Sequence, residues 1–133
     1  MSKTTKTTKS IGKILIVEDN ELNLKLFRDL LKSYGYTVLD TKDGSEAINL
    51  VKEHLPNLIV MDIQLRGLSG FDIIQQIKAD KDIQHIPIVA VTAFAMKDDK
   101  DRILASGCEA YVPKPISIAP FLEVIRKHIK LEV

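Results

Sequence analysis

The sequence has little cysteine, no tryptophan, few aromatic residues and no long hydrophobic run. One cysteine, Cys108, among 133 residues excludes an intramolecular disulfide and is typical of proteins in the reducing cytosol. No apolar stretch approaches the roughly 20 residues that a transmembrane helix requires. The lysine-containing start MSKTTKTTKS is not followed by the hydrophobic segment of a secretory signal. We therefore expect a cytoplasmic protein without membrane insertion.

The chain also lacks an excess of charge of either sign. Its 19 Lys and Arg residues nearly balance 18 Asp and Glu residues, so no broad basic field favours nucleic acid as a partner. The length and the 45% hydrophobic content suit one domain with one substantial core. Residues 1–12 are rich in Lys and Thr and predict a disordered tail, with a single folded domain over 13–133. A basic arm for nucleic acid or membranes is the less favoured interpretation of this tail.

Apolar runs rich in β-branched residues alternate along the chain with stretches that have helical spacing. Nearly continuous apolar runs are typical of parallel strands that are covered on both faces. The strand candidates span 13–18, 36–40, 57–62, 86–92 and 109–113. This alternation predicts an α/β fold, a flavodoxin-like (βα)5 three-layer sandwich with a five-stranded parallel sheet of order 2-1-3-4-5.

The helices are predicted from apolar residues spaced three and four positions apart. Asn20 or Asp19 is the expected cap of the first helix, Gly35 its end, and Ser117 the cap of the last helix. The expected inward-facing residues are Leu24, Phe27, Leu31 and Tyr34 in the first helix, Ala47, Leu50 and Val51 in the second, Phe71, Ile74 and Ile77 in the third, and Ile118, Phe121, Leu122, Ile125 and Ile129 in the last.

Acidic residues end two of the predicted strands. The first apolar run leads into Glu18 and Asp19, and the run LIVMD ends in Asp62. In an open α/β sheet of this order, ligands bind beyond the carboxyl ends of the strands where the order reverses, between the first and third strands. Thr92 ends the fourth strand and Lys114 directly follows the fifth. We therefore expect all five side chains to lie at one edge of the sheet.

This set of side chains indicates a cation and a phosphoryl group. Clustered carboxylates repel, and the pKa of at least one rises unless a cation compensates the charge. Oxygen ligands favour Mg²⁺ or Mn²⁺ over zinc, and bound Mg²⁺ readily accepts phosphate oxygens. Lys114 and Thr92 could then hold a phosphoryl group, while one carboxylate acts as the nucleophile. Each acid taken alone is better explained as a helix cap or a surface residue, but the whole set at the correct strand ends favours the metal site.

Four short motifs carry a resemblance to a known family. EDN at 18–20, MD at 61–62, VTA at 91–93 and KP at 114–115 occur in an order and spacing that resembles the receiver domain of two-component response regulators, the CheY-like domain, over about residues 13–130. Two positions depart from the family pattern. Glu18 stands where the family usually has Asp, and Arg66 stands where it typically has proline.

The resemblance implies a role for each residue of the site. Asp62 would accept a phosphoryl group from a histidine of a sensor histidine kinase or a histidine phosphotransfer protein. Mg²⁺, or Mn²⁺ in its place, would be bound by Asp19, Asp62, Glu18 and the backbone carbonyl of Gln64. Thr92 and Lys114 would hold the phosphoryl oxygens. Thr92 and Tyr111 would form a conformational switch, in which Tyr111 follows Thr92 inward on activation. The Lys114–Pro115 peptide bond would be cis.

The resemblance further implies the function and the partner surfaces. Longer segments such as VEDNELNLKLF resemble a branch of single-domain regulators of bacterial cell division. We therefore expect a single-domain regulator that is not an enzyme in the usual sense, acts on a downstream protein target, and is recruited to a cell pole by its kinase. The expected partner surface consists of Asn20, Leu22, Asn23 and Leu24 on the first helix. Phe94 and Met96, near the switch, belong either to the core or to this partner-binding surface.

Three other functions remain as alternatives. A Mg²⁺-dependent phosphatase of the haloacid dehalogenase type also uses an Asp nucleophile at a strand end, but it places an acid two residues later, where this chain has Gln64. A phosphorelay shuttle unrelated to cell division would use the same site. A nucleotide- or flavin-binding module is disfavoured because no glycine-rich phosphate-binding loop follows the first strand.

Overall fold

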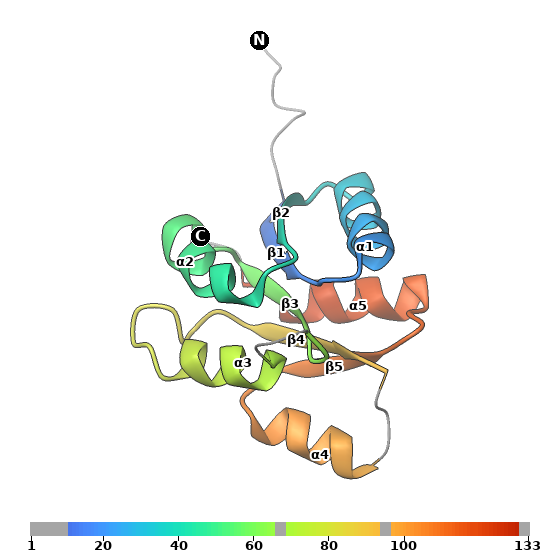
Figure 1. Cartoon of the computed structure of the whole chain (residues 1–133). Helices are drawn as coiled ribbons and strands as arrows, with labels where there is room; N and C mark the ends of the chain where they lie inside the picture. Colours follow the sequence, from blue (N-terminus) through green and yellow to red (C-terminus); the bar gives the residue numbers. More distant parts are fainter. Residues whose placement is uncertain (1–10, 66–68, 94–96, 131–133) are drawn as a thin grey trace.

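The computed structural model describes residues 11–65, 69–93 and 97–130, and it shows five parallel strands alternating with five helices (Figure 1). The strands pair in the order β2-β1-β3-β4-β5, which confirms the predicted flavodoxin-like sheet. The strands are β1 Lys13–Val17, β2 Thr37–Thr41, β3 Leu58–Asp62, β4 Ile88–Thr92 and β5 Ala110–Pro113. The helices are α1 Glu21–Ser33, α2 Gly44–His54, α3 Gly70–Lys78, α4 Lys97–Ala105 and α5 Ile118–His128.

Helices cover the sheet on both faces, which gives the three layers visible in Figure 1. Residues of α2, α3 and α4 form one core with alternate residues of the strands, among them Leu15, Ile59 and Ala90. Residues of α1 and α5 form the second core with the intervening strand residues, and Phe27 stacks on Phe121 between these helices at 5.5 Å. Because successive side chains of a strand point to opposite faces, both cores require continuous apolar strands.

The helix faces agree with the predicted spacing except at a few positions. Tyr34 and Ile118 are about half exposed, so their predicted burial is wrong, whereas Phe71 is partly buried and packs against the core as expected. Tyr34 lies beyond the last residue of α1 and Ile118 is the first residue of α5, where the helical repeat no longer aims a side chain at the sheet. In α3 the predicted Ile74 and Ile77 are fully buried, and so is Ile73, which was not predicted.

The caps show which polar residues begin the helices. Asn20 caps α1, because its side chain accepts a hydrogen bond from Asn23 N, and Gly35 follows the helix with a φ of +99°. Ser117 precedes α5 but makes no side-chain cap hydrogen bond, so that prediction was only half right. Ile11 N donates to Gly35 O, and Gly12 O accepts from Thr37 N. These two residues, which the sequence places in the tail, are therefore bonded to the domain.

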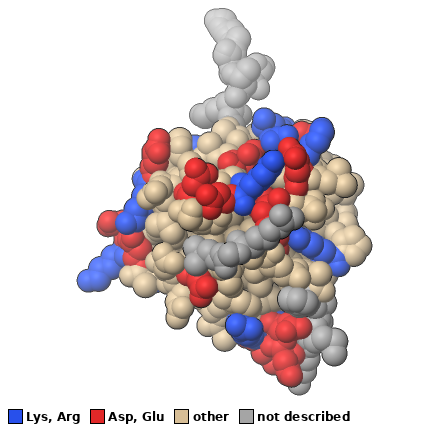
Figure 2. Space-filling model, in the orientation of Figure 1, with Lys and Arg blue, Asp and Glu red and all other residues tan. Residues whose placement is uncertain are grey.

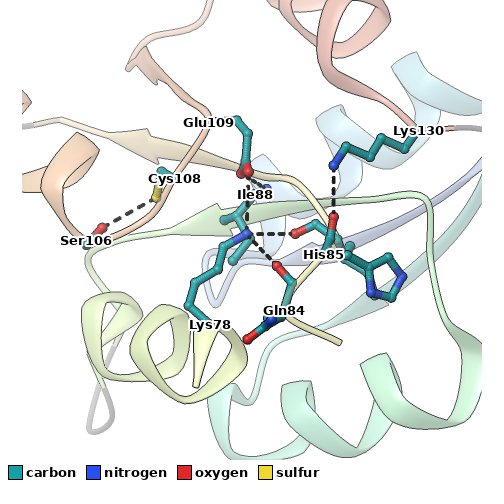
Figure 3. A network of polar contacts seen from close by, with 9 residues as sticks. Lys78, Gln84, His85, Ile88, Ser106, Cys108, Glu109 and Lys130 are labelled. Atoms are coloured by element: carbon teal, nitrogen blue, oxygen red, sulfur yellow. Dashed lines mark hydrogen bonds and ion pairs between the residues drawn. The ribbon is translucent and has the colours of Figure 1, made fainter. Parts of the chain in front are cut away.

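A polar network ties together the amino ends of β4 and β5, at the sheet edge opposite the strand-end acids (Figure 3). Lys78 Nζ donates to the backbone oxygens of Gln84 and Ile86, each at 3.1 Å, and lies 3.4 Å from Glu109 Oε2. Glu109 Oε1 in turn accepts a hydrogen bond of 2.7 Å from Ile88 N. This edge is thus closed by bonds within the fold, while the carboxyl edge presents the acids.

Candidate functional site

The alternation of side chains along each strand determines from which face of the sheet each site residue approaches the site. Glu18 and Asp62 continue the strand positions of Ile16 and Val60, which belong to the core beneath α1 and α5. Thr92 continues the positions of Ile88 and Ala90, which belong to the opposite core. Since parallel strands end at a common edge, the acids and Thr92 approach that edge from the two faces of the sheet.

The predicted acidic cluster is present. One carboxylate oxygen from each of Glu18, Asp19 and Asp62 lies within 4.8 Å of the others. Glu18 is 1% exposed and Asp62 is 3% exposed, so two of the three carboxylates are shielded from water. The strand register aligns Asp62 with Val91 of β4, and it thereby brings Asp62 next to the end of β4 that carries Thr92.

Lys114 supplies the positive charge of the site. Its Nζ lies 3.1 Å from Glu18 Oε1 and 3.3 Å from Asp62 Oδ2. Its backbone N–H donates to Thr92 O at 2.8 Å, which fixes the start of the loop after β5. The following Lys114–Pro115 peptide bond is cis, as predicted. One ammonium group thus faces two buried carboxylates.

The electrostatics leave this cluster short of positive charge. Burial and, to a smaller extent, the adjacent Asp62 carboxylate raise the pKa of Glu18, against the opposing effects of Asn20 N–H and Lys114, and the net pKa is about 7. Glu18 Oε1 has no hydrogen-bond partner among the described residues, although the Lys114 ammonium lies within ion-pair distance. A buried acceptor without a donor, among three acids, fits a divalent cation with oxygen ligands.

Two local features position the loop after Asp62. Asp62 Oδ1 accepts a hydrogen bond from Gln64 N at 2.9 Å, and Gly70 N donates to Ile63 O. A Cβ at Gly70 would clash with the Asp62 carbonyl oxygen and would lie 2.7 Å from Ile63 Cα. Only glycine therefore lets α3 start this close to β3, a requirement that the sequence pattern did not reveal. Arg66, in the same loop, lies outside the described residues.

The predicted switch residues occupy neighbouring strands. Thr92 is fully buried at the end of β4, and Tyr111 in β5 is partly buried against the core beneath α2, α3 and α4. Ala90 and Tyr111 are register partners, so Tyr111 stands one strand away and two positions before Thr92. The Lys100 ammonium lies over the Tyr111 ring, 5.6 Å from its centroid.

The predicted partner surface is only partly exposed. Leu22 is 77% exposed and Asn20 is also exposed, but Leu24 is 3% exposed and packs into the core, so it cannot contact a partner. Leu26, four residues after Leu22, is 47% exposed and belongs to this face instead. A helical wheel could have found it, because Leu26 points away from the buried stripe of α1. Phe94 and Met96 lie outside the described residues.

A groove lies beside this exposed face of α1. Its volume is about 370 Å³, and the volumes of other surface grooves range from about 260 to 460 Å³. It is lined by Asn23, Leu26, Phe27, Ala93, Lys114, Pro115 and Ile116. The groove thus joins α1 to the lysine of the acidic cluster. On the face drawn in Figure 2, positive and negative side chains are mostly interspersed, with a group of acidic side chains at the bottom of the view, over α4.

Comparison with known proteins agrees with this geometry. The family model of the response regulator receiver domain matches residues 14–126. The polar-differentiation response regulator DivK of Brucella ovis is 53% identical over 116 residues, which cover 87% of this chain and 94% of that protein. DivK of Brucella abortus gives the same identity and coverage.

Solved structures give the same result. The receiver domain of the sensor histidine kinase PA1611 from Pseudomonas aeruginosa superposes with a TM-score of 0.81 at 31% identity, over 88% of this chain and 96% of that domain, and it holds a magnesium ion in its active-site cleft. The chemotaxis protein CheY4 of Vibrio cholerae shares the fold with a TM-score of 0.84 at 21% identity, over 90% of this chain and all of that one. The chain belongs to the family of response regulator receiver domains.

Proposed function

We propose that this protein accepts a phosphoryl group on Asp62 and thereby switches its affinity for other proteins. The observation that carries the proposal is the placement of one ammonium group, Lys114 Nζ, within 3.1 Å of Glu18 and 3.3 Å of Asp62 in an otherwise acidic, buried cluster. Such a cluster suits a reaction that brings an anion and a divalent cation to the same point. The cluster concentrates repulsion between carboxylates at one sheet edge, a cost that favours a functional role over a purely structural one.

Mg²⁺ would be held by Asp19, Asp62, Glu18 through water and the backbone carbonyl of Gln64, with Mn²⁺ as a substitute. When bound, it would compensate the negative charge that gathers on the transferring phosphoryl group. These residues fit the ion because their donor atoms are oxygens and because Glu18 Oε1 is buried without a hydrogen-bond donor. The receiver domain at 31% identity that holds a magnesium ion in its active-site cleft supports this assignment.

The donor of the phosphoryl group would be a phosphohistidine of a sensor histidine kinase or a histidine phosphotransfer protein. An Asp62 oxygen attacks phosphorus, an O–P bond forms, the P–N bond breaks, and its electron pair stays on the imidazole nitrogen. Lys114 and Thr92 hold the phosphoryl oxygens while charge builds on them. The chain is thus a phosphoacceptor that assists its own phosphorylation and dephosphorylation, not an enzyme that turns over a separate substrate.

The signal would leave the site through Thr92 and Tyr111. As Thr92 moves toward the phosphoryl group, it vacates space on the α4 side of the sheet, where Tyr111 packs only partly buried. This is a shift between two packings of one fold. The kinase would bind the exposed side of α1, at Asn20, Leu22, Asn23 and Leu26, beside the groove that reaches Lys114.

The similarity to DivK supports a role in bacterial cell division rather than in an unrelated phosphorelay. We infer that the protein works in the cytoplasm and is recruited to a cell pole through its kinase. None of the helices over residues 11–65, 69–93 and 97–130 is long and apolar enough to cross a membrane. The match to a receiver model over residues 14–126 favours this role over a phosphatase of the haloacid dehalogenase type.

The test is phosphorylation by a small-molecule donor. The protein is incubated with acetyl phosphate and Mg²⁺, and its intact mass is measured for wild type, Asp62→Asn and Asp101→Asn, an exposed acid on α4. We expect the mass of one phosphoryl group on wild type and Asp101→Asn and none on Asp62→Asn. An adduct on Asp62→Asn, or continuous hydrolysis of phosphate esters by wild type, would refute the proposal.

A further inference from the structure

The side chain of Gln64 bridges two loops at the edge of the site. Its Oε1 accepts a hydrogen bond of 2.8 Å from Ala93 N, while its own backbone N–H donates to Asp62 Oδ1 at 2.9 Å. Gln64 is therefore bonded at one end to the phosphoacceptor and at the other to the peptide that follows Thr92. The residue connects the loop after β3 with the loop after β4.

The Ala93 N–H is a donor at the place where a new anion would arrive. Asp62 and Val91 are register partners, so the peptide bond between Thr92 and Ala93 begins just beyond the strand that adjoins Asp62. A phosphoryl group brings several strong acceptor oxygens and prefers N–H donors that are already oriented. In the unphosphorylated chain, however, the amide oxygen of Gln64 already occupies this donor.

We propose, building on the function proposed above, that Gln64 is a competitive latch. Its side-chain oxygen holds the Ala93 N–H until an anion on Asp62 displaces it, and the latch thereby lowers the affinity of the site for the phosphoryl group. Gln64 is a positioning residue, since it acts through Ala93 N–H.

Space for the displaced side chain is present next to the latch. A cavity of about 460 Å³ is lined by Gln64, Ser69, Thr92, Asp99 and Arg102, together with Ile63, Leu65, Phe71 and Ile103. The polar groups along this cavity can receive the carboxamide after it leaves Ala93. Opening the latch therefore requires a side-chain rotation into existing space rather than a change in the core.

The size of the effect follows from a single hydrogen bond. The hydrogen bond between Ala93 N–H and Gln64 Oε1 must break before the anion can accept from Ala93 N–H. The apparent affinity for the anion is therefore lower by the factor by which this hydrogen bond favours the bonded over the broken state. A typical net hydrogen bond corresponds to a factor of about two to ten. Removing the acceptor should therefore raise the apparent affinity for a phosphoryl mimic by about two- to tenfold.

The experiment uses beryllofluoride with Mg²⁺ as the probe and compares wild type, Gln64→Leu, Gln64→Ala and the control Gln76→Leu, a change at an exposed glutamine of α3. Amide hydrogen exchange at Ala93 is first measured without metal or beryllofluoride, and the apparent affinity for beryllofluoride is then measured by titration. We expect faster exchange at Ala93 and about two- to tenfold tighter binding in both Gln64 variants, with the control unchanged.

Unchanged exchange at Ala93, or equal or weaker binding in the Gln64 variants while wild type still binds the probe, would overturn the latch alone. If neither wild type nor any variant binds beryllofluoride, the proposed phosphoacceptor site itself is refuted. The two failures therefore give different results in the same titration.

Discussion

Asp62→Asn should stabilise the metal-free protein at pH 8, because it removes a charge from a cluster with too many acids. The carboxylate oxygens of Glu18, Asp19 and Asp62 lie within 4.8 Å of one another. At an effective dielectric constant of about 20, each pair at this distance costs roughly 3–4 kcal/mol. Asp62 takes part in two such pairs, so its charge costs roughly 7 kcal/mol in all.

The attraction to Lys114 offsets much of this cost. Lys114 Nζ lies 3.3 Å from Asp62 Oδ2, and at the same effective dielectric constant this contact is worth roughly 5 kcal/mol. The net gain from Asp62→Asn at pH 8 is then about 2 kcal/mol. The asparagine oxygen can still accept the hydrogen bond from Gln64 N. Because burial raises the pKa of Glu18 to about 7, the gain should shrink below pH 7, where Glu18 is protonated.

The assay is urea denaturation of wild type, Asp62→Asn and the exposed control Asp101→Asn, in EDTA and again in saturating Mg²⁺. We expect Asp62→Asn to be more stable than wild type in EDTA at pH 8, and wild type to gain more from Mg²⁺. Equal or lower stability of Asp62→Asn in EDTA at pH 8, or a gain of the same size in Asp101→Asn, would refute the electrostatic argument.

Two further predictions concern groups at the two edges of the sheet. Folding raises the pKa of Glu18 from 4.5 to about 7. Between these pH values the folded chain therefore binds more protons than the unfolded chain. The free energy of unfolding of metal-free wild type should consequently fall by about 1–3 kcal/mol as the pH rises from 4.5 through 7. Glu18→Gln should lack this fall, and parallel pH profiles of the two proteins in urea denaturation would contradict the assignment. At the opposite edge, Glu109→Ala leaves Ile88 N–H without its acceptor and should cost about 1–3 kcal/mol, whereas Glu109→Gln keeps an acceptor and should cost less. Urea denaturation measures the loss of stability in both Glu109 variants, whose phosphorylation by acetyl phosphate should be unchanged. Equal losses in the two variants would show that the hydrogen bond to Ile88 N–H does not account for the loss of stability.

The positions of the strands and of the central site residues could be predicted from the sequence because topology determines them. Once β1 and β3 are recognised as neighbours in a parallel sheet, Glu18 and Asp62 must lie at a common edge. The same reasoning places Thr92 and Lys114, whose strands follow in order. Long-range contact was predictable here because each of these residues directly ends or follows a strand.

What the sequence did not predict depends on side-chain directions and close approaches. The exposure of Tyr34 and Ile118 reflects their positions at helix ends, where the helical period no longer applies. The need for glycine at position 70 arises from the Asp62 carbonyl oxygen, a contact between segments that no local pattern encodes. Leu24 was assigned both to the inward face of the first helix, by the helical repeat, and to the partner surface, by resemblance; its burial confirms the first assignment and contradicts the second.

The central claim, that the acids at this edge bind one divalent ion, is tested most directly with Mn²⁺ as a paramagnetic probe in NMR. On titration with Mn²⁺, the backbone amide signals of Glu18, Asp19, Asp62 and Gln64 should broaden first, while those of Lys78 and Glu109 at the opposite edge persist, and Mg²⁺ should restore the lost signals by competition. Broadening that spreads evenly over the chain, or that centres on acids other than these, would contradict the account.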